Sequence, residues 1–218
     1  MNSFPGNFRV LCKNARLNGD IPLTTLLNEI STFAWDIICF SETHLEDSDI
    51  ELIGGHRLIS YRGELKYAGV AILIHAKHVD KIKRIIPVYG RLLSIDILLQ
   101  NELWRVLAVY FPHAGYPKAD LKKMSNELRK NLKDAGRSNM KCIIAGDFNT
   151  SLHIGERGAI LDDIANEFGL EICNRHGYCA QADIWTFRSS MNIKCHIDYI
   201  LTSSRAQVLR TPASLHLH

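Results

Sequence analysis

The sequence lacks the features that would place it among membrane, secreted or fibrous proteins. No apolar run approaches the roughly 18–20 residues that a helix needs to cross a bilayer, so we expect no membrane partner. Residues 1–8 lack the charged-then-apolar layout of a signal peptide. There is no internal repeat, low-complexity tract or linker, and of the 218 residues 46% are hydrophobic and 22% charged. This composition is typical of a soluble globular protein, and we expect one domain over residues 1–218.

Paired cysteine motifs and a large net charge are also missing. The six cysteines include no Cys-x-x-Cys pair, and Cys12, Cys39 and Cys142 lie in apolar, strand-like runs. A reduced thiol in such a run behaves as a small hydrophobic group, so we expect a reducing, intracellular compartment and no zinc site. The net charge is only +3. Nucleic acid is permitted as a partner, but a basic surface for it must be local.

The first half of the chain is predicted to be rich in strands. Residues 8–12 and 36–41 are predicted to be strands, and Asp20 and Pro22 open a helix between them, which makes a βαβ-like start. Several strand candidates follow without an intervening helix, and neighbours joined by short turns should pair antiparallel. These candidates are residues 56–61, 69–75, 82–86, 91–99 and 103–111.

The second half alternates helices with strands. Apolar stripes predict helices at 117–135 and 157–168, and the basic residues of the first of these helices are expected to form a solvated face. Shorter apolar runs predict strands after Met140 and at 170–173, 185–187 and 195–202. The pattern predicts one α/β domain with a large antiparallel component.

The segment Gly146-Asp147-Phe148-Asn149 follows a strand that should be buried on both faces. On an extended backbone, Asp147 and Asn149 would point the same way, so one could activate a water while the other donates to a developing negative charge. A simple Asp/Asn turn after a strand explains the same residues. Both interpretations stay open at this point.

Polar residues stand at the ends of nearly all the predicted strands. Burying these polar groups without hydrogen-bond partners would be costly. If the strands share one core, the groups can converge on one rim of the sheets and form hydrogen bonds with one another. Glu42 is either a ligand of a hard cation or a surface residue, and Tyr110 is either a site residue or an amphipathic core aromatic. An inward-facing Asp198 needs a paired donor. The strand-end residues are Asn14, Glu42, Tyr110, Asp147 with Asn149, Thr186 and Asp198.

Seven short motifs in order, between position 8 and about 209, resemble the endonuclease/exonuclease/phosphatase superfamily in its abasic-site-endonuclease-like branch. The spacing of several of them most resembles the endonuclease domain of non-LTR retrotransposons, of the RTE-like and related LINE kinds. The motifs are Asn14-Ala15-Arg16, Ser41-Glu42-Thr43-His44, Gly69-Val70-Ala71-Ile72-Leu73-Ile74, Tyr110-Phe111-Pro112, Gly146-Asp147-Phe148-Asn149, Trp185-Thr186-Phe187 and Ile197-Asp198-Tyr199-Ile200-Leu201.

The resemblance implies an α/β (α+β) fold, a four-layer αββα sandwich of two packed mixed β-sheets flanked by helices. It implies a metal-dependent endonuclease that nicks a phosphodiester bond of duplex DNA for retrotransposition, with Mg²⁺ or Mn²⁺ as cofactor. Such a chain would work as a monomer, natively fused to a reverse transcriptase, in the nucleus. Two rivals are a phosphatase or sphingomyelinase-like hydrolase of the same fold and a domain that binds DNA without cutting it.

The resemblance also implies roles for individual residues. Glu42 would bind the metal, and Asp147 would activate the attacking water. Asn149, Asn14 and Tyr110 would hold the phosphate, and Asp198 would orient a histidine. The residues implied on the DNA side are Thr186, Arg16 and His113; Arg16 and His113 favour the retrotransposon branch over the repair branch.

One departure from the family pattern concerns its closing Ser-Asp-His motif. The sequence stops at Ser214-Leu215-His216-Leu217-His218, where that motif should begin. In the family this histidine pairs with the carboxylate at the Asp198 position and the acid helps the metal. His216 and His218 lack a neighbouring acid, so we do not expect them to substitute. We therefore expect the domain to be truncated and impaired in cleavage.

Overall fold

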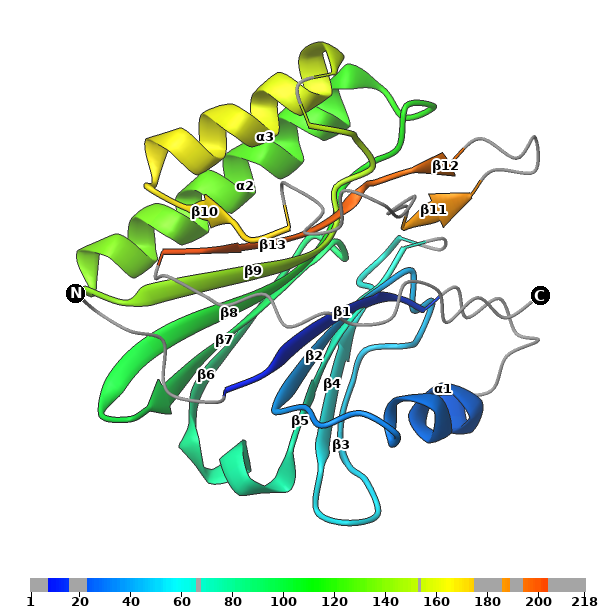
Figure 1. Ribbon diagram of the computed structural model, residues 1–218, viewed down its shortest axis with the longest axis vertical. Helices are drawn as coiled ribbons and strands as arrows, with labels where there is room; N and C mark the ends of the chain where they lie inside the picture. The colour runs from blue at the N-terminus through cyan, green and yellow to red at the C-terminus, as the bar shows by residue number, and fades with distance from the viewer. Residues whose placement is uncertain are drawn as a thin grey trace, which may run out of the picture.

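Two β-sheets packed face to face form the centre of the computed structural model, with helices on both outer faces (Figure 1). The structure describes residues 8–15, 23–65, 68–152, 154–174, 186–188 and 194–203. The predicted Arg16, the expected helix start at Asp20, and His216 and His218 lie outside these ranges. In the described part of the chain, no helix is long and apolar enough to cross a membrane.

The first sheet has five strands in the order β1-β2-β5-β4-β3. Its strands β1 and β2 are parallel and are joined by the helix α1, which confirms the predicted βαβ-like start. Leu26 and Ile30 of this helix pack against Phe40 and Leu73 on the outer face of the sheet. The elements are β1 Val10–Asn14, α1 Leu23–Ile30, β2 Ile37–Ser41, β3 Ser48–Glu51, β4 Arg57–Tyr61 and β5 Val70–Ile74.

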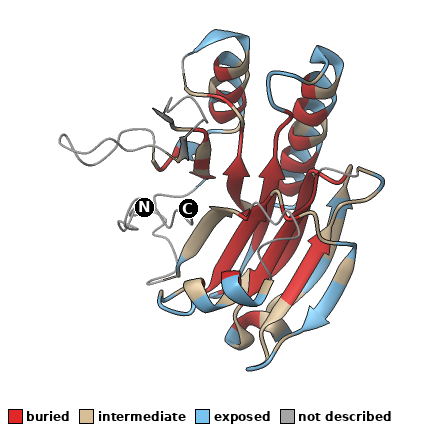
Figure 2. Cartoon of the chain, turned by 90° about the vertical axis from the view of Figure 1, so that its right-hand side faces the viewer, coloured by how far each residue is buried: buried red, intermediate tan, exposed pale blue. Residues whose placement is uncertain are grey.

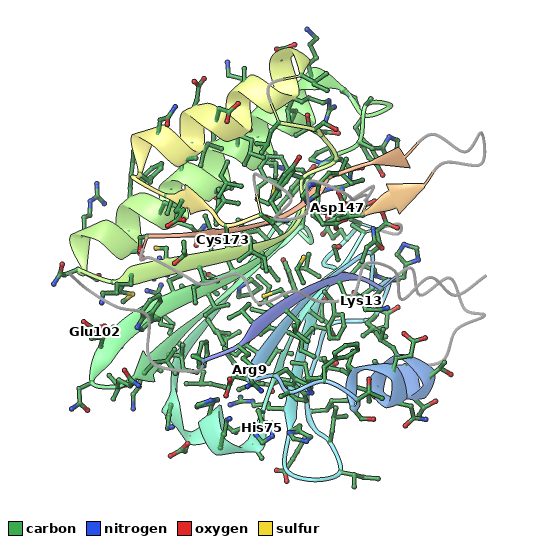
Figure 3. All side chains as sticks on the ribbon, in the orientation of Figure 1. Arg9, Lys13, His75, Glu102, Asp147 and Cys173 are labelled. Carbon is green, nitrogen blue, oxygen red and sulfur yellow. The ribbon has the colours of Figure 1, made fainter. Side chains whose placement is uncertain are left out.

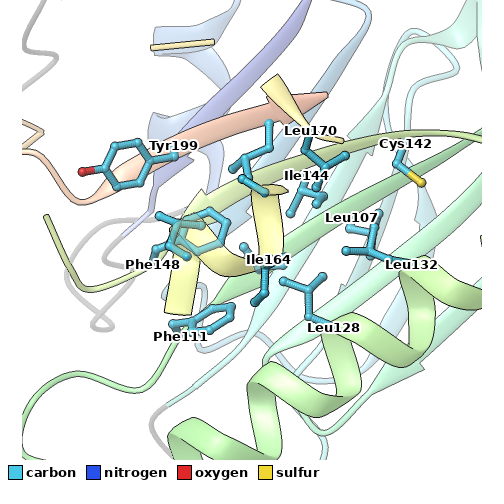
Figure 4. Packing of buried hydrophobic residues seen from close by; sticks show 14 of the residues in the cluster. Leu107, Phe111, Leu128, Leu132, Cys142, Ile144, Phe148, Ile164, Leu170 and Tyr199 are labelled. Carbon is cyan, nitrogen blue, oxygen red and sulfur yellow. The ribbon is translucent and has the colours of Figure 1, made fainter. Parts of the chain in front are cut away.

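The second sheet has six strands in the order β10-β13-β9-β8-β7-β6. Helices α2 and α3 cover its outer face, where Leu128 and Ile164 pack against Leu107 and Ile144 (Figure 4). A separate two-stranded ladder pairs β11 with β12. The elements are β6 Ile82–Val88, β7 Leu92–Leu99, β8 Glu102–Tyr110, α2 Lys118–Arg137, β9 Lys141–Asp147, α3 Gly155–Glu167, β10 Glu171–Ile172, β11 Phe187–Arg188, β12 Lys194–Cys195 and β13 Asp198–Thr202.

Strands β2 and β5 are almost wholly apolar because both of their faces are buried (Figure 2). On β2, Ile37 and Cys39 face the second sheet, whereas Ile38 and Phe40 face α1. Successive side chains of a strand point to opposite faces, so a strand between two apolar layers shows no alternation. The expected four-layer sandwich is confirmed. Cys12, Cys39, Cys142 and Cys173 carry free thiols, as predicted for the first three.

The antiparallel pairing expected between the strands at 69–75 and 82–86 is wrong. These segments, β5 and β6, belong to different sheets, and a 3₁₀ helix, η1 (Ala76–Lys81), carries the chain from one sheet to the other. The reason is that β5 already has β2 and β4 on its two edges, so no edge remains for β6. The edge strand β3 was not predicted, because Ser48-Asp49-Ile50-Glu51 is polar and mostly exposed.

Candidate active site

Asp147, whose side chain is labelled in Figure 3, is the last residue of β9. The strand lies between β8 and β13, so Asp147 is directly opposite Tyr110 on one side and Asp198 on the other. Asn14 reaches it from the end of β1 in the other sheet, and its Nδ2 donates a hydrogen bond to Asp147 Oδ2 at 3.1 Å. Four of the predicted site residues, from both sheets, therefore meet at one rim.

The Asp147 carboxyl is an unusually basic acid. Its residue is 1% exposed, and burial raises its pKa well above the usual range. The negative charges of Asp198 and Glu42 raise this pKa further, while hydrogen bonds from the Asn149 backbone and the Asn14 side chain oppose the shift. Burial and like charges both disfavour the ionised form. A carboxylate in this setting accepts a proton more readily than an exposed one and is suited to act as a base.

Gly146 allows the end of β9 to approach β8 closely. A Cβ atom at this position would lie 1.9 Å from the Val109 carbonyl oxygen, and the backbone has a φ of +155°. Any side chain would collide with backbone, so only glycine brings Asp147 into line with Tyr110. The glycine before the acid has a steric role in building the site.

Asn149 lies in a turn and does not continue the strand. Its φ is +50°, and its backbone N–H donates to Asp147 Oδ1 at 2.7 Å, which is an Asx turn. Its side-chain Nδ2 donates to the Phe111 carbonyl oxygen at 2.8 Å. The turn interpretation is correct, and the expectation of two side chains pointing the same way from an extended backbone is wrong. The turn nevertheless holds one oxygen of Asp147 in place.

Tyr110 is a buried phenol that faces the acids. It is 6% exposed, and burial raises its pKa, with Glu42 and Asp147 adding to the shift and Arg91 opposing it. The hydroxyl is therefore neutral and acts as a donor at physiological pH. The alternative of an ordinary core aromatic is partly right, because Tyr110 also packs in the layer between the sheets.

Glu42 follows β2 in a left-handed conformation, with a φ of +52°. Its charge raises the pKa of both Tyr110 and Asp147, so its carboxylate acts on the same space. Beside it, Ser41 Oγ and Thr43 Oγ1 are buried without a hydrogen-bond partner among the described residues. In the same part of the chain, no group of three His, Cys, Asp or Glu side chains could hold a metal ion. The oxygen atoms of Glu42, Ser41 and Thr43 suit a hard cation that has one protein carboxylate as a ligand and takes its other ligands from water and phosphate.

Thr186 supports Asp198 by holding its backbone. Thr186 Oγ1 accepts hydrogen bonds from the backbone N–H groups of Ile197 at 3.0 Å and Asp198 at 3.1 Å. Asn174, which sequence reasoning missed, braces the same segment: its Nδ2 donates to the Asp198 carbonyl oxygen at 2.9 Å, and its Oδ1 accepts from Ile200 N–H at 3.1 Å. The segment that carries Asp198 is thus fixed from two sides.

His113 is exposed on the loop after β8. Its Nδ1 accepts a hydrogen bond from Gly115 N–H at 3.0 Å, and its ring lies 4.6 Å from that of Tyr116. Arg157 of α3 donates to the backbone carbonyls of Pro112 and His113 and ties down this loop. The loop therefore presents His113 to solvent in a defined conformation, within the segment that follows Tyr110.

Sequence reasoning missed Arg91, Asn174 and Arg157 as residues of this site. Arg91 precedes the apolar run of β7 directly, and it is 2% exposed. A polar residue at the end of an apolar run was the signal available for it, since the same signal identified Asn14 and Asp147. Asn174 and Arg157 lie outside the strands, and only tertiary contacts reveal them.

Comparison with known proteins identifies the family and the fold. The Endonuclease/Exonuclease/phosphatase family profile matches residues 6–218. A search of curated proteins gives no match.

Among solved structures, the AP endonuclease LMAP from Leishmania major is similar with a TM-score of 0.72 at 14% identity, covering 90% of this chain and 79% of that one. A variant of the 3′ phosphatase NExo from Neisseria, bound to a product DNA hairpin, gives 0.69 at 16% identity, covering 90% and 86%. The endonuclease domain of TRAS1, a telomere-specific non-LTR retrotransposon, gives 0.65 at 17% identity, covering 89% and 83%.

These structures share the fold, and the profile match spans nearly all of the sequence. The resemblance first noted from short motifs is therefore confirmed at the level of the family. The chain belongs to the endonuclease/exonuclease/phosphatase family.

Proposed function

We propose that this chain is a divalent-metal-dependent endonuclease domain that nicks a phosphodiester bond of duplex DNA, as in a non-LTR retrotransposon. The observation that carries the proposal is the meeting of Asn14, Tyr110, Asp147 and Asp198 at one rim, built on the Asn14–Asp147 hydrogen bond. The similarity to the TRAS1 domain supports the retrotransposon branch.

Asp147 is the general base in this proposal. Its two oxygens are held by Asn14 and by the Asn149 backbone, so the carboxylate cannot turn away from the water it activates. Burial and the charge of Asp198 make it a stronger base than an exposed acid. Beyond this, Asp198 would orient a histidine, as the family resemblance implies.

Tyr110 and Asn14 contribute hydrogen bonds in the proposal. A neutral phenol fixed in the core donates to a phosphate oxygen without having to reorganise as negative charge grows there. Asn14 would have two roles: it holds Asp147, the general base, and it contacts the groups around the scissile phosphate. Asn149 keeps the turn that aligns Asp147, in addition to any contact with the phosphate.

Glu42 would hold Mg²⁺ or Mn²⁺, with Ser41 and Thr43 beside it as buried polar groups that ordered water would satisfy. A divalent cation bound there would neutralise charge on the phosphate oxygens and on the leaving 3′ oxygen. The negative charges of Asp198 and Glu42, which raise the pKa of Asp147, mark the space where such a cation would be accommodated.

Duplex DNA would bind mainly through its phosphates, with Arg16 and His113 on the DNA side and Thr186 acting through the backbone that it holds. The DNA hairpin in the Neisseria structure supports a nucleic-acid partner for this fold. The logarithm of the binding constant for DNA should then fall linearly with the logarithm of the salt concentration, and a series of band-shift assays at increasing salt measures this. An affinity for DNA that does not change with salt concentration contradicts the proposal.

A plasmid-nicking assay tests the reaction. Because the 218 residues contain no Ser-Asp-His, the chain is assayed alongside a form with that segment appended. With Mn²⁺ or Mg²⁺ the extended form should nick supercoiled plasmid, and Asp147→Asn should reduce the rate by about a hundredfold or more. Lys130→Ala, at an exposed position of α2, is the matched control and should be as active as its parent.

Two outcomes overturn the proposal. Release of inorganic phosphate from a 3′-phosphorylated oligonucleotide, without nicking, assigns the site to a phosphatase. Salt-sensitive DNA binding without cleavage by any form assigns the chain to a DNA-binding domain that does not cut.

A further inference from the structure

Arg91 is a buried cation held by aromatic rings. The residue is 2% exposed, and no ion pair joins it to a carboxylate in the part of the chain that the structure describes. Its guanidinium carbon instead lies 4.7 Å from the centre of the Tyr110 ring and 4.6 Å from that of the Tyr116 ring. Two aromatic rings thus surround one charge.

The backbone of Arg91 is tied to Tyr110 as well. The Arg91 carbonyl oxygen accepts a hydrogen bond from Tyr110 N–H at 2.8 Å, and Arg91 Nη1 donates to the Tyr110 carbonyl oxygen at 3.5 Å. The side chain therefore holds Tyr110 through its ring face and through its main chain. Few other arrangements would fix both the position and the plane of a phenol.

Arg105, in the same sheet, shows what a purely structural arginine looks like here. It is 0% exposed and forms a two-armed pair with Asp96, at 2.7 Å and 2.9 Å. Such a pair offsets the cost of burying the charge, whereas two ring faces and a carbonyl offset less of it. The buried charge of Arg91 is therefore compensated less fully than that of Arg105, and it lies directly against the Tyr110 ring.

The charge acts on the phenol. Arg91 lowers the pKa of Tyr110, against the larger effects of burial and of Glu42. A more acidic O–H is a stronger hydrogen-bond donor to an anionic oxygen. Only arginine suits the position, because a guanidinium stays charged when buried and its planar group stacks on ring faces, whereas a lysine ammonium readily loses its proton there.

We propose that Arg91 is a positioning residue, which as a clamp packs against the rings of Tyr110 and Tyr116, fixes the Tyr110 phenol and strengthens the hydrogen bond from Tyr110 to a phosphate oxygen. The inference rests on the proposed function, in which Tyr110 contacts the scissile phosphate. The clamp also joins the loop that carries His113 to the catalytic rim, because the ring of Tyr116 contacts both His113 and Arg91.

A double-mutant cycle tests the clamp in the form of the chain that nicks DNA. Arg91→Met and Tyr110→Phe should each lower kcat about tenfold with little change in KM. The double variant should be no slower than Tyr110→Phe alone, because Arg91 acts through the hydroxyl that Phe lacks. A double variant slowed by the product of the two factors overturns the proposal. If Arg91→Met does not fold, Arg91→Lys takes its place in the cycle.

A second readout needs no activity. In protein labelled with [¹³Cζ]tyrosine, the Tyr110 signal is the one lost in Tyr110→Phe, and Arg91→Met should shift it together with the Tyr116 signal. Lys123→Met is the matched control, because Lys123 Nζ lies 3.4 Å above the ring of Tyr89. It should shift the Tyr89 signal, leave that of Tyr110 unchanged and leave kcat unchanged.

The outcomes separate the two proposals. If the extended chain nicks DNA but the Tyr110 signal does not respond to Arg91→Met, the clamp is wrong and the proposed function stands. If the signals shift but no form nicks DNA, the proposed function is wrong, and the catalytic role of the clamp falls with it.

Discussion

Replacing Asp147 with asparagine should make the fold more stable while removing the activity. The carboxylate is 1% exposed and lies beside Asp198 and Glu42, so the folded protein bears the cost of burying and crowding its charge. Asparagine removes the charge, and its amide oxygen still accepts the hydrogen bond from the Asn149 backbone. The Asn14 amide must turn to meet the new NH₂ group, which limits the gain.

The expected gain is about 0.5–2 kcal/mol, the usual size for relieving a strained functional group. For a chain of this length that raises Tm by about 1–8 °C. Thermal unfolding followed by circular dichroism, without divalent cations, measures it. Asp80→Asn, at an exposed position on η1, is the control and should leave Tm nearly unchanged.

The gain should depend on pH with a definite sign. The folded-state pKa of Asp147 lies above the ordinary value of 3.8. As pH rises from that value, the unfolded chain loses its proton first, so the wild-type fold loses stability until pH passes the folded-state pKa. The difference between variant and wild type should therefore be smaller at about pH 5 than at about pH 8. A variant that melts below wild type at both pH values refutes the reasoning, because the hydrogen bonds would then outweigh the burial cost.

Three further predictions concern metal, the core and the rim. Glu42→Gln should weaken Mn²⁺ binding at least about tenfold in calorimetric titration, and equal affinity contradicts its role as a ligand. Arg105→Met should cost about 3–5 kcal/mol in urea unfolding, because Asp96 is left buried and unpaired; a loss below about 1 kcal/mol would contradict that. Gly146→Ala should cost at least about 2 kcal/mol and shift the end of β9, because its Cβ meets backbone at 1.9 Å. Its control, Gly136→Ala, meets nothing within 4 Å and should be neutral or slightly stabilising in the same melts.

The strands and the residues at their ends were readable from the sequence alone. A strand buried on both faces is mainly apolar, so Ile37–Ser41 and Val70–Ile74 stand out, and the polar residue that ends such a run is conspicuous. The βαβ start was equally readable, because a helix between two successive strands favours a parallel pair. The edge strand β3 could not be predicted from the sequence. It pairs with only one neighbouring strand and is mostly exposed, so its residues are polar and form no apolar run.

Tertiary structure decided which strand ends meet. Asn14 and Asp147 lie 133 residues apart and in different sheets, and only the packing of those sheets joins them. Local sequence could not place β6 either, since its pairing depends on which sheet edges other strands had already taken. Arg91 makes the same point about the site. In the sequence it is only the polar start of a predicted strand, and its charge acquires a role when folding brings the rings of Tyr110 and Tyr116 against it. Burial and long-range contact are properties of the assembled core, and no local pattern encodes them.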